Sequence, residues 1–121
     1  MPRRKILLID DKRSVGYALC SILEHLGHTA WYARNGLEAL DILNKVSFDV
    51  LVTDVLTPQM DGWELVLEVH KKFPSLAVLL VRNKDTPVTD EYTTLSKPFS
   101  MVEMESAIEA AIAHSAKASS T

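Results

Sequence analysis

Short apolar runs alternate with segments of helical periodicity along most of the chain, and this alternation restricts the possible fold more than any other feature. Apolar runs of this length, separated by amphipathic helices, are typical of parallel strands that are covered on both faces of a sheet. The sequence therefore predicts an α/β fold with a doubly wound parallel sheet. The predicted strands are 5–10, 29–33, 49–54, 77–81 and 92–96.

The helical segments carry their own boundary signals. Gly27 follows the first apolar helical stripe and suits the left-handed residue that commonly ends a helix. Asn35 can cap the second helix, and Ser100 with Glu103 forms a capping-box pattern at the start of the last one. The predicted helices begin at about residues 12, 36, 62 and 100, and the first ends near residue 26.

The composition suits one globular domain. The chain has 121 residues, of which 47% are hydrophobic and 24% charged, and we expect a single domain over 1–121 with its core in 4–114. The small polar tail, 115–121, is expected to fray. The net charge of −3 disfavours a nucleic-acid partner. Without an 18-residue apolar stretch or a signal-peptide pattern, the sequence predicts a cytoplasmic protein that does not bind membranes.

The cysteine and the histidines do not indicate a site. Cys20 is the only cysteine and lies among apolar residues, so we assign it a packing role. The four histidines are scattered and are interpreted as surface or packing residues: His25, His28, His70 and His114.

Acidic residues and one lysine follow three of the predicted strands. Asp10 and Asp11 follow the apolar run 6–9 of the first strand, Asp54 ends the third, and Lys97 follows the fifth. Taken singly, the acidic pair could simply favour the amino end of a helix, and Asp54 and Lys97 could be ordinary strand-end and surface residues. Because the carboxyl ends of parallel strands meet at one edge, however, these side chains should converge. Carboxylates suit Mg²⁺, and a lysine binds phosphate as a point charge, so the pattern indicates a metal-assisted phosphoryl site.

Three sequence elements resemble the receiver domain of the two-component response regulators. They are the ILLIDD end of the first strand, Asp54 with the following Pro58 and Met60-Asp61-Gly62, and the late Lys97-Pro98-Phe99. The resemblance covers essentially residues 4–114. It implies a flavodoxin-like fold whose five parallel strands are ordered 2-1-3-4-5.

The resemblance also implies roles for individual residues. In receivers, the aspartate matching Asp54 takes a phosphoryl group from a histidine kinase or a phosphotransfer protein. Asp11, Asp54 and the backbone carbonyl of Leu56 would bind Mg²⁺, with Asp10 acting largely through a water. Lys97 would pair with the phosphoryl oxygens, and the Lys97-Pro98 peptide would be cis.

The sequence departs from the receiver pattern at three places. Arg82 stands where the fourth strand normally ends in Thr or Ser, and Thr94 stands where receivers carry a switch aromatic. If the fifth strand is 92–96, nine residues, 83–91, connect it to Arg82. A parallel crossover that includes its helix needs at least about 10–12 residues. We therefore expect the helix between the fourth and fifth strands to be shortened or missing.

Two functions remain open from the sequence. The acidic residues and Lys97 favour a receiver that is phosphorylated on Asp54 with Mg²⁺ and has no enzymatic activity beyond its own phosphorylation and dephosphorylation. The Arg82 side chain could point into solvent, or it could turn inward and pair with Asp54. Two opposite charges 4 Å apart attract each other by about 4 kcal/mol at an effective dielectric of 20. Arg82, together with Thr94 and the short connection, favours the second function, a pseudo-receiver that docks a protein partner without phosphorylation.

A third class, a Mg²⁺-dependent phosphatase with an aspartyl nucleophile, is disfavoured. Leu56 stands where that class needs a general-acid aspartate, and nothing supplies a substrate cap. No DNA-binding or enzymatic segment follows residue 114. The output therefore either passes through an unknown downstream protein partner or lies in a longer protein of which this chain is a fragment.

Overall fold

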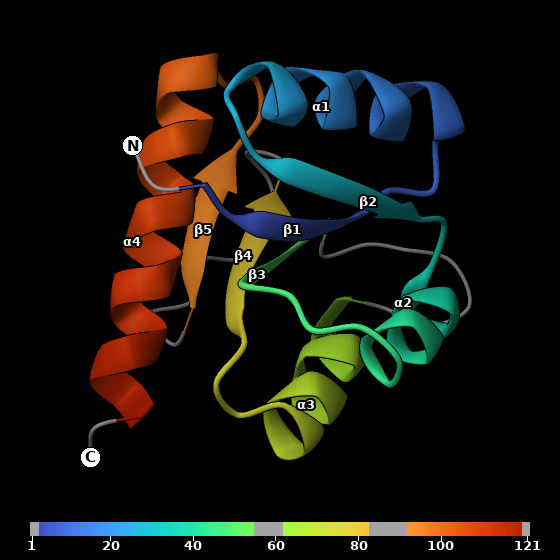
Figure 1. Ribbon diagram of the computed structural model, residues 1–121, viewed down its shortest axis with the longest axis vertical. Helices are drawn as coiled ribbons and strands as arrows, with labels where there is room; N and C mark the ends of the chain where they lie inside the picture. The colour runs from blue at the N-terminus through green and yellow to red at the C-terminus, as the bar shows by residue number, and fades with distance from the viewer. Residues whose placement is uncertain (1–2, 55–61, 83–91, 120–121) are drawn as a thin grey trace.

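A computed structural model describes residues 3–54, 62–82 and 92–119 of the chain, without the side chains of 62, 63 and 116–119. These residues form a central sheet with helices against it (Figure 1). The elements in chain order are β1 (Lys5–Ile9), α1 (Arg13–His25), β2 (Thr29–Ala33), α2 (Gly36–Leu43), β3 (Val50–Asp54), α3 (Gly62–Lys72), β4 (Ala77–Arg82), β5 (Thr93–Ser96) and α4 (Met101–Ser119).

The sheet confirms the predicted topology. Its five strands are ordered β2-β1-β3-β4-β5 and every pairing is parallel, which is the flavodoxin-like arrangement. The strands in the middle of the sheet are buried along almost their whole length, as expected for apolar runs covered on both faces. The predicted bounds differ by at most one residue: β1 ends at Ile9, β3 begins at Val50, β4 extends to Arg82 and β5 begins at Thr93.

The two faces of the sheet carry separate apolar cores. Successive residues of a strand point to opposite faces, and β1 shows the division clearly. Ile6 and Leu8 belong to the core that α1 and α4 cover, whereas Leu7 and Ile9 belong to the core that α2 and α3 cover. Figure 1 shows these two helix pairs on opposite sides of the strands. Cys20 packs against the first core, and burial raises the pKa of its thiol to about 11, which suits the packing role.

The predicted helix boundaries are confirmed by their capping contacts. Gly27 follows α1 with a φ of 100°, a conformation that costs glycine little. The Asn35 side chain accepts a hydrogen bond from the Glu38 amide. Ser100 and Glu103 exchange reciprocal side-chain to backbone hydrogen bonds before α4.

The last helix extends into the segment 115–121 that the sequence predicted to fray. The last helix, α4, continues to Ser119, well beyond residue 115. Two features explain the extension. The segment 110–119 is rich in alanine, the best helix former, and the Ser115 hydroxyl donates a hydrogen bond of 3.3 Å to the carbonyl of Ser75.

Several predicted features lie outside the described residues. These are the Leu56 carbonyl, Pro58, the Met60-Asp61 pair and the connection 83–91. Within the part of the chain that the structure describes, none of the helices is long and apolar enough to cross a membrane.

Candidate functional site

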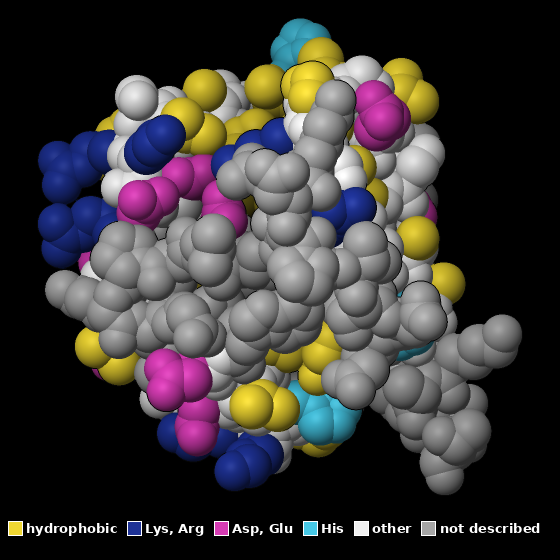
Figure 2. Space-filling model, turned by 180° about the vertical axis from the view of Figure 1, so that it is seen from behind, with side chains coloured by type: hydrophobic (Ala, Val, Ile, Leu, Met, Phe, Trp, Pro, Cys, Tyr) yellow, Lys and Arg dark blue, Asp and Glu magenta, His cyan; other side chains and the backbone are white. Residues whose placement is uncertain are grey.

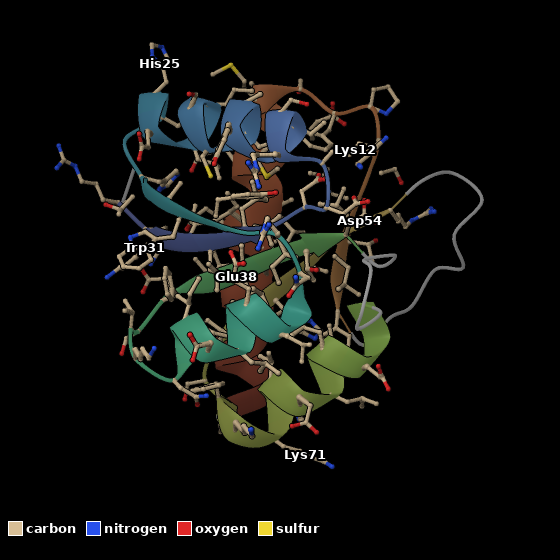
Figure 3. All side chains as sticks on the ribbon, turned by 90° about the vertical axis from the view of Figure 1, so that its right-hand side faces the viewer. Lys12, His25, Trp31, Glu38, Asp54 and Lys71 are labelled. Carbon is tan, nitrogen blue, oxygen red and sulfur yellow. The ribbon has the colours of Figure 1, made fainter. Side chains whose placement is uncertain are left out.

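The parallel register brings the ends of β1 and β3 to the same edge of the sheet. Ile9 is paired with Thr53, so Asp10 and Asp54 each follow a paired position on neighbouring strands. Figure 3 shows Asp54 and Lys12 at this edge, with His25 and Trp31 at the opposite edge. The edge with Asp10 and Asp54 is called the carboxyl edge below, because the strands end there.

Lys97 reaches Asp54 from β5. Its ammonium Nζ lies 3.0 Å from Asp54 Oδ2, and the Asp54 side chain is 16% exposed. The Lys97-Pro98 peptide is cis, as expected. The backbone of the lysine is also fixed, because its amide donates a 2.9 Å hydrogen bond to the carbonyl of Arg82. Asp54 at the end of β3 and Lys97 after β5 therefore meet across the end of β4, the strand that lies between them.

Asp10 is shielded from water although its neighbour Asp11 is exposed. Asp10 is 4% exposed, and its Oδ1 accepts a 2.9 Å hydrogen bond from the Lys12 amide. Burial raises the pKa of the Asp10 carboxyl, and the charges of Asp11 and Asp54 raise it further. The Lys12 amide and the Lys97 ammonium act in the opposite direction. Asp10, Asp11, Asp54 and Lys97 thus share one electrostatic environment.

The donor set at the carboxyl edge suits Mg²⁺. The described side chains that could bind the ion, Asp10, Asp11 and Asp54, offer carboxylate oxygens, which this hard cation prefers, and Mg²⁺ in proteins commonly takes one or two carboxylates with waters and phosphate oxygens. Among residues 3–54, 62–82 and 92–119, no three His, Cys, Asp or Glu side chains form a ready-made metal cage.

Tyr32 is part of this edge and was missed by sequence reasoning. Its hydroxyl donates a 2.6 Å hydrogen bond to the backbone carbonyl of Asp10. Burial raises the pKa of Tyr32, and the Asp10 charge adds to the rise, so the phenol keeps its proton and remains a donor. The ring lies against Gly16 of α1, where a Cβ would collide with it. A glycine within a predicted helix was the one available signal, because such a residue often marks close packing.

Arg82 and Thr94 lie on the strands predicted for them. Arg82 ends β4 opposite Ser96 and is half-buried. Thr94 pairs with Leu80 in the middle of β5 and is also half-buried. The strand ending in Arg82 therefore runs beside the segment that carries Lys97.

The comparisons with known proteins identify the family. The model of the response regulator receiver domain matches residues 6–109. The sensor kinase CckA of Brucella abortus (strain 2308) is 28% identical over an alignment of 113 positions, which covers 86% of this chain and 12% of that protein. The chain thus spans about an eighth of this curated relative.

Solved receiver structures share the fold along nearly their whole length. The signal receiver domain of an HD domain-containing protein from Pseudomonas fluorescens Pf-5 is 27% identical, with a TM-score of 0.83 over 96% of this chain and 99% of that one. The chemotaxis response regulator CheY4 of Vibrio cholerae is 26% identical, with a TM-score of 0.81 over 91% and 99%. The comparison with CheY4 shows a three-residue gap between β4 and β5, which agrees with the predicted shortening. The chain belongs to the response regulator receiver domain family of two-component signalling.

Proposed function

We propose that this receiver domain accepts a phosphoryl group on Asp54 from a histidine kinase or a phosphotransfer protein. The contact of 3.0 Å between Lys97 Nζ and Asp54 Oδ2 carries the proposal, because it places a cation beside the only aspartate that ends β3. Receiver domains are generally phospho-acceptor modules rather than enzymes. The similarity to part of a protein named a sensor kinase supports a kinase as the phosphoryl source. A cytoplasmic location, where such a kinase would supply the group, is part of the proposal.

The chemistry needs little beyond positioning and charge. A carboxylate oxygen of Asp54 would form the bond to phosphorus while the phosphorus–nitrogen bond of a phosphohistidine breaks, and the ring nitrogen keeps the electron pair and takes up a proton. Phosphoryl transfer is promoted mainly by holding the reactants in line and by neutralising the phosphoryl oxygens. Lys97, already beside Asp54, would screen the product phosphate.

Asp10, Asp11 and Asp54 are the proposed Mg²⁺ residues, together with the backbone carbonyl of Leu56, which lies outside the described residues. When bound, the ion would neutralise charge on the phosphoryl oxygens. Asp11 and Asp54 lie close enough to Asp10 for their charges to raise its pKa, and this cluster of carboxylates supports a cation at this edge.

A titration with Mg²⁺, with and without beryllofluoride, tests the proposal through amide NMR shifts. We expect saturable Mg²⁺ binding that beryllofluoride tightens, with the largest shifts near Asp10 and Asp54, because the mimic occupies the place of a phosphoryl group. Absence of any response under saturating Mg²⁺ would exclude Asp54 as an acceptor.

A phosphorylation-independent pseudo-receiver is the second candidate. One observation favours it: Arg82 ends β4 at the carboxyl edge, and its carbonyl accepts the amide of Lys97. Asp54 pairs with Val81, the residue before Arg82, and a guanidinium turned toward Asp54 from there would oppose Mg²⁺ by its charge. In that case the domain would bind an unknown downstream protein partner constitutively. Loss of partner binding in an Asp54→Ala variant would contradict this second function.

A further inference from the structure

The backbone of Asp10 is tied to β2 at both of its polar groups. Its amide donates to the Ala33 carbonyl at 3.3 Å, which continues the ladder by one residue beyond β1. Its carbonyl accepts a 2.6 Å hydrogen bond from the hydroxyl of Tyr32. This side-chain contact takes the place of a backbone hydrogen bond at the point where β1 and β2 separate. Asp10 is almost fully shielded, so few waters can substitute for a lost phenol.

That carbonyl belongs to the peptide that joins Asp10 to Asp11. Rotation of this peptide would move the Asp11 side chain and the start of the turn that leads into α1. The same turn is closed by the bond between the Lys12 amide and Asp10 Oδ1. The Tyr32 hydroxyl on β2 therefore restrains the peptide between Asp10 and Asp11. Because this peptide sets the direction of both side chains, the hydroxyl also orients the two carboxylates.

The position of the phenol is itself fixed by two neighbours on α1. Gly16 is buried and lets the Tyr32 ring approach the helix backbone, since a Cβ there would collide with the ring. Tyr17 packs edge to face against the same ring, with ring centroids 5.2 Å apart. Gly16, Tyr17 and Tyr32 together form what we call the tyrosine clamp.

We propose that Tyr32 is a positioning residue for the acidic pair, and that the tyrosine clamp holds the Asp10–Asp11 peptide in the geometry that binds Mg²⁺. The inference rests on the proposed function, because Mg²⁺ binding at Asp10 and Asp11 is part of that function. It adds a residue on β2, a strand that contributes none of the expected ligands. Removal of partners that orient metal ligands typically weakens metal binding about 10- to 100-fold.

The Tyr32→Phe variant tests the hydroxyl alone, because the ring that fills the space above Gly16 remains. We expect its Mg²⁺ dissociation constant to rise about 10-fold. Tyr92→Phe is the matched control: it removes a phenol hydroxyl from a ring that lies near Leu76 and Val78 at the amino end of β4, outside the clamp, and should leave the Mg²⁺ affinity within about twofold of the wild type. Equal Mg²⁺ affinities for Tyr32→Phe and the wild type would overturn the inference.

Amide hydrogen exchange in the metal-free protein gives a second readout that does not depend on the ion. The Lys12 amide, which bonds to Asp10 Oδ1, should exchange several-fold faster in Tyr32→Phe, while the buried amides of Leu8 and Val52 keep their wild-type rates. A purely structural loss would accelerate the core amides as well. Exchange of Lys12 at the wild-type rate would count against the clamp.

The Gly16→Ala variant disturbs the same contact, that of the Tyr32 ring, from the side of α1. The added methyl group must displace the Tyr32 ring, so we expect weaker Mg²⁺ binding and faster Lys12 exchange, as in Tyr32→Phe. The readouts separate the two proposals. A wild-type protein that binds no Mg²⁺ would contradict the proposed function, whereas wild-type binding that Tyr32→Phe leaves unchanged would contradict only the role of Tyr32.

Discussion

At the carboxyl ends of the strands two aspartates interact with the same lysine, whereas at the amino ends two basic side chains each have a carboxylate of their own. Asp54 contacts Lys97 directly, and Asp10 is stabilised by the same ammonium. The exposed Asp11 adds a further negative charge, which raises the pKa of Asp10. Like charges thus remain close together at the carboxyl edge.

The amino ends of the strands show the opposite arrangement. The ring of His28 accepts the Arg4 amide at Nδ1, so its proton sits on Nε2 and is donated to the Glu105 carboxylate at 2.9 Å. The Arg4 guanidinium makes two hydrogen bonds with Glu109. Both glutamates lie on α4, so these contacts fasten the last helix to the starts of β1 and β2.

The two ends of the sheet differ in what their charged side chains do. Pairing at the amino ends satisfies buried polar groups and stabilises the helix packing. Clustering of carboxylates at the carboxyl ends disfavours the folded protein, but it leaves an edge whose negative charge a divalent cation would neutralise. Figure 2, which shows the molecule from behind, displays acidic and basic side chains close together beside the residues that are not described.

The largest effect is expected from replacing an aspartate at the carboxyl end of β3, with an aspartate at the amino end of the same strand as the control. Asp54→Asn should abolish the beryllofluoride response, because the acceptor oxygen loses its charge. Asp49→Asn is the matched control, because Asp49 immediately precedes β3 and its Oδ2 accepts only a backbone amide, that of Lys5, in the described contacts. NMR titration of both variants should show the loss in Asp54→Asn alone, and a full response from that variant would refute the assignment.

Breaking the buried pair at the amino ends should affect stability instead. His28→Ala leaves Glu105 shielded without its partner, and we expect the free energy of unfolding to fall by about 3 kcal/mol. Urea unfolding measures this loss. The control is His25→Ala, at an exposed histidine, whose free energy of unfolding should stay within about 0.5 kcal/mol of the wild type. The folded variant should still respond to beryllofluoride. A loss of that response would show that the two ends are coupled.

Asp10→Asn should stabilise the protein while weakening Mg²⁺ binding. The folded pKa of Asp10 is raised above its unfolded value, so the ionised group lowers stability at neutral pH and stops doing so below the unfolded pKa, near 4. We expect the thermal midpoint at pH 7 to rise by about 5 °C, as about 1 kcal/mol would produce in a domain of this size. Thermal unfolding from pH 7 to pH 3 should show the gain disappear, and a constant gain would exclude the ionisation of Asp10 as its cause.

The smallest effect is expected at the half-exposed pair of Arg4 and Glu109. Glu109→Gln removes the charge but keeps a hydrogen-bonding oxygen, so unfolding should become easier by only about 0.5 kcal/mol. Added salt should reduce this difference, because it screens the charge of the wild-type pair. A loss as large as that of His28→Ala would mean that Arg4 and Glu109 belong to one buried network with His28.

The fold could be predicted because its signals are local. Apolar runs, the glycine after the first helix and the Ser100–Glu103 box each act over a few residues, and each was found in the structure. The residues of the carboxyl edge were predictable for a related reason. In a parallel sheet every strand ends at the same edge, so Asp54 and Lys97 had to approach one another once the topology was known.

The sequence by itself determined the strands, the caps and which charges follow the strands, because apolar periodicity and helix ends depend on short-range pattern, and its resemblance to receivers implied the strand order. Only the tertiary structure decided the partners of side chains from distant segments. His28 and Glu105 are 77 residues apart and Tyr32 and Asp10 are 22 apart. The histidine had seemed an ordinary packing residue and the tyrosine carried no motif. Such contacts depend on the rotation of each element and on small gaps such as Gly16, which no local pattern encodes.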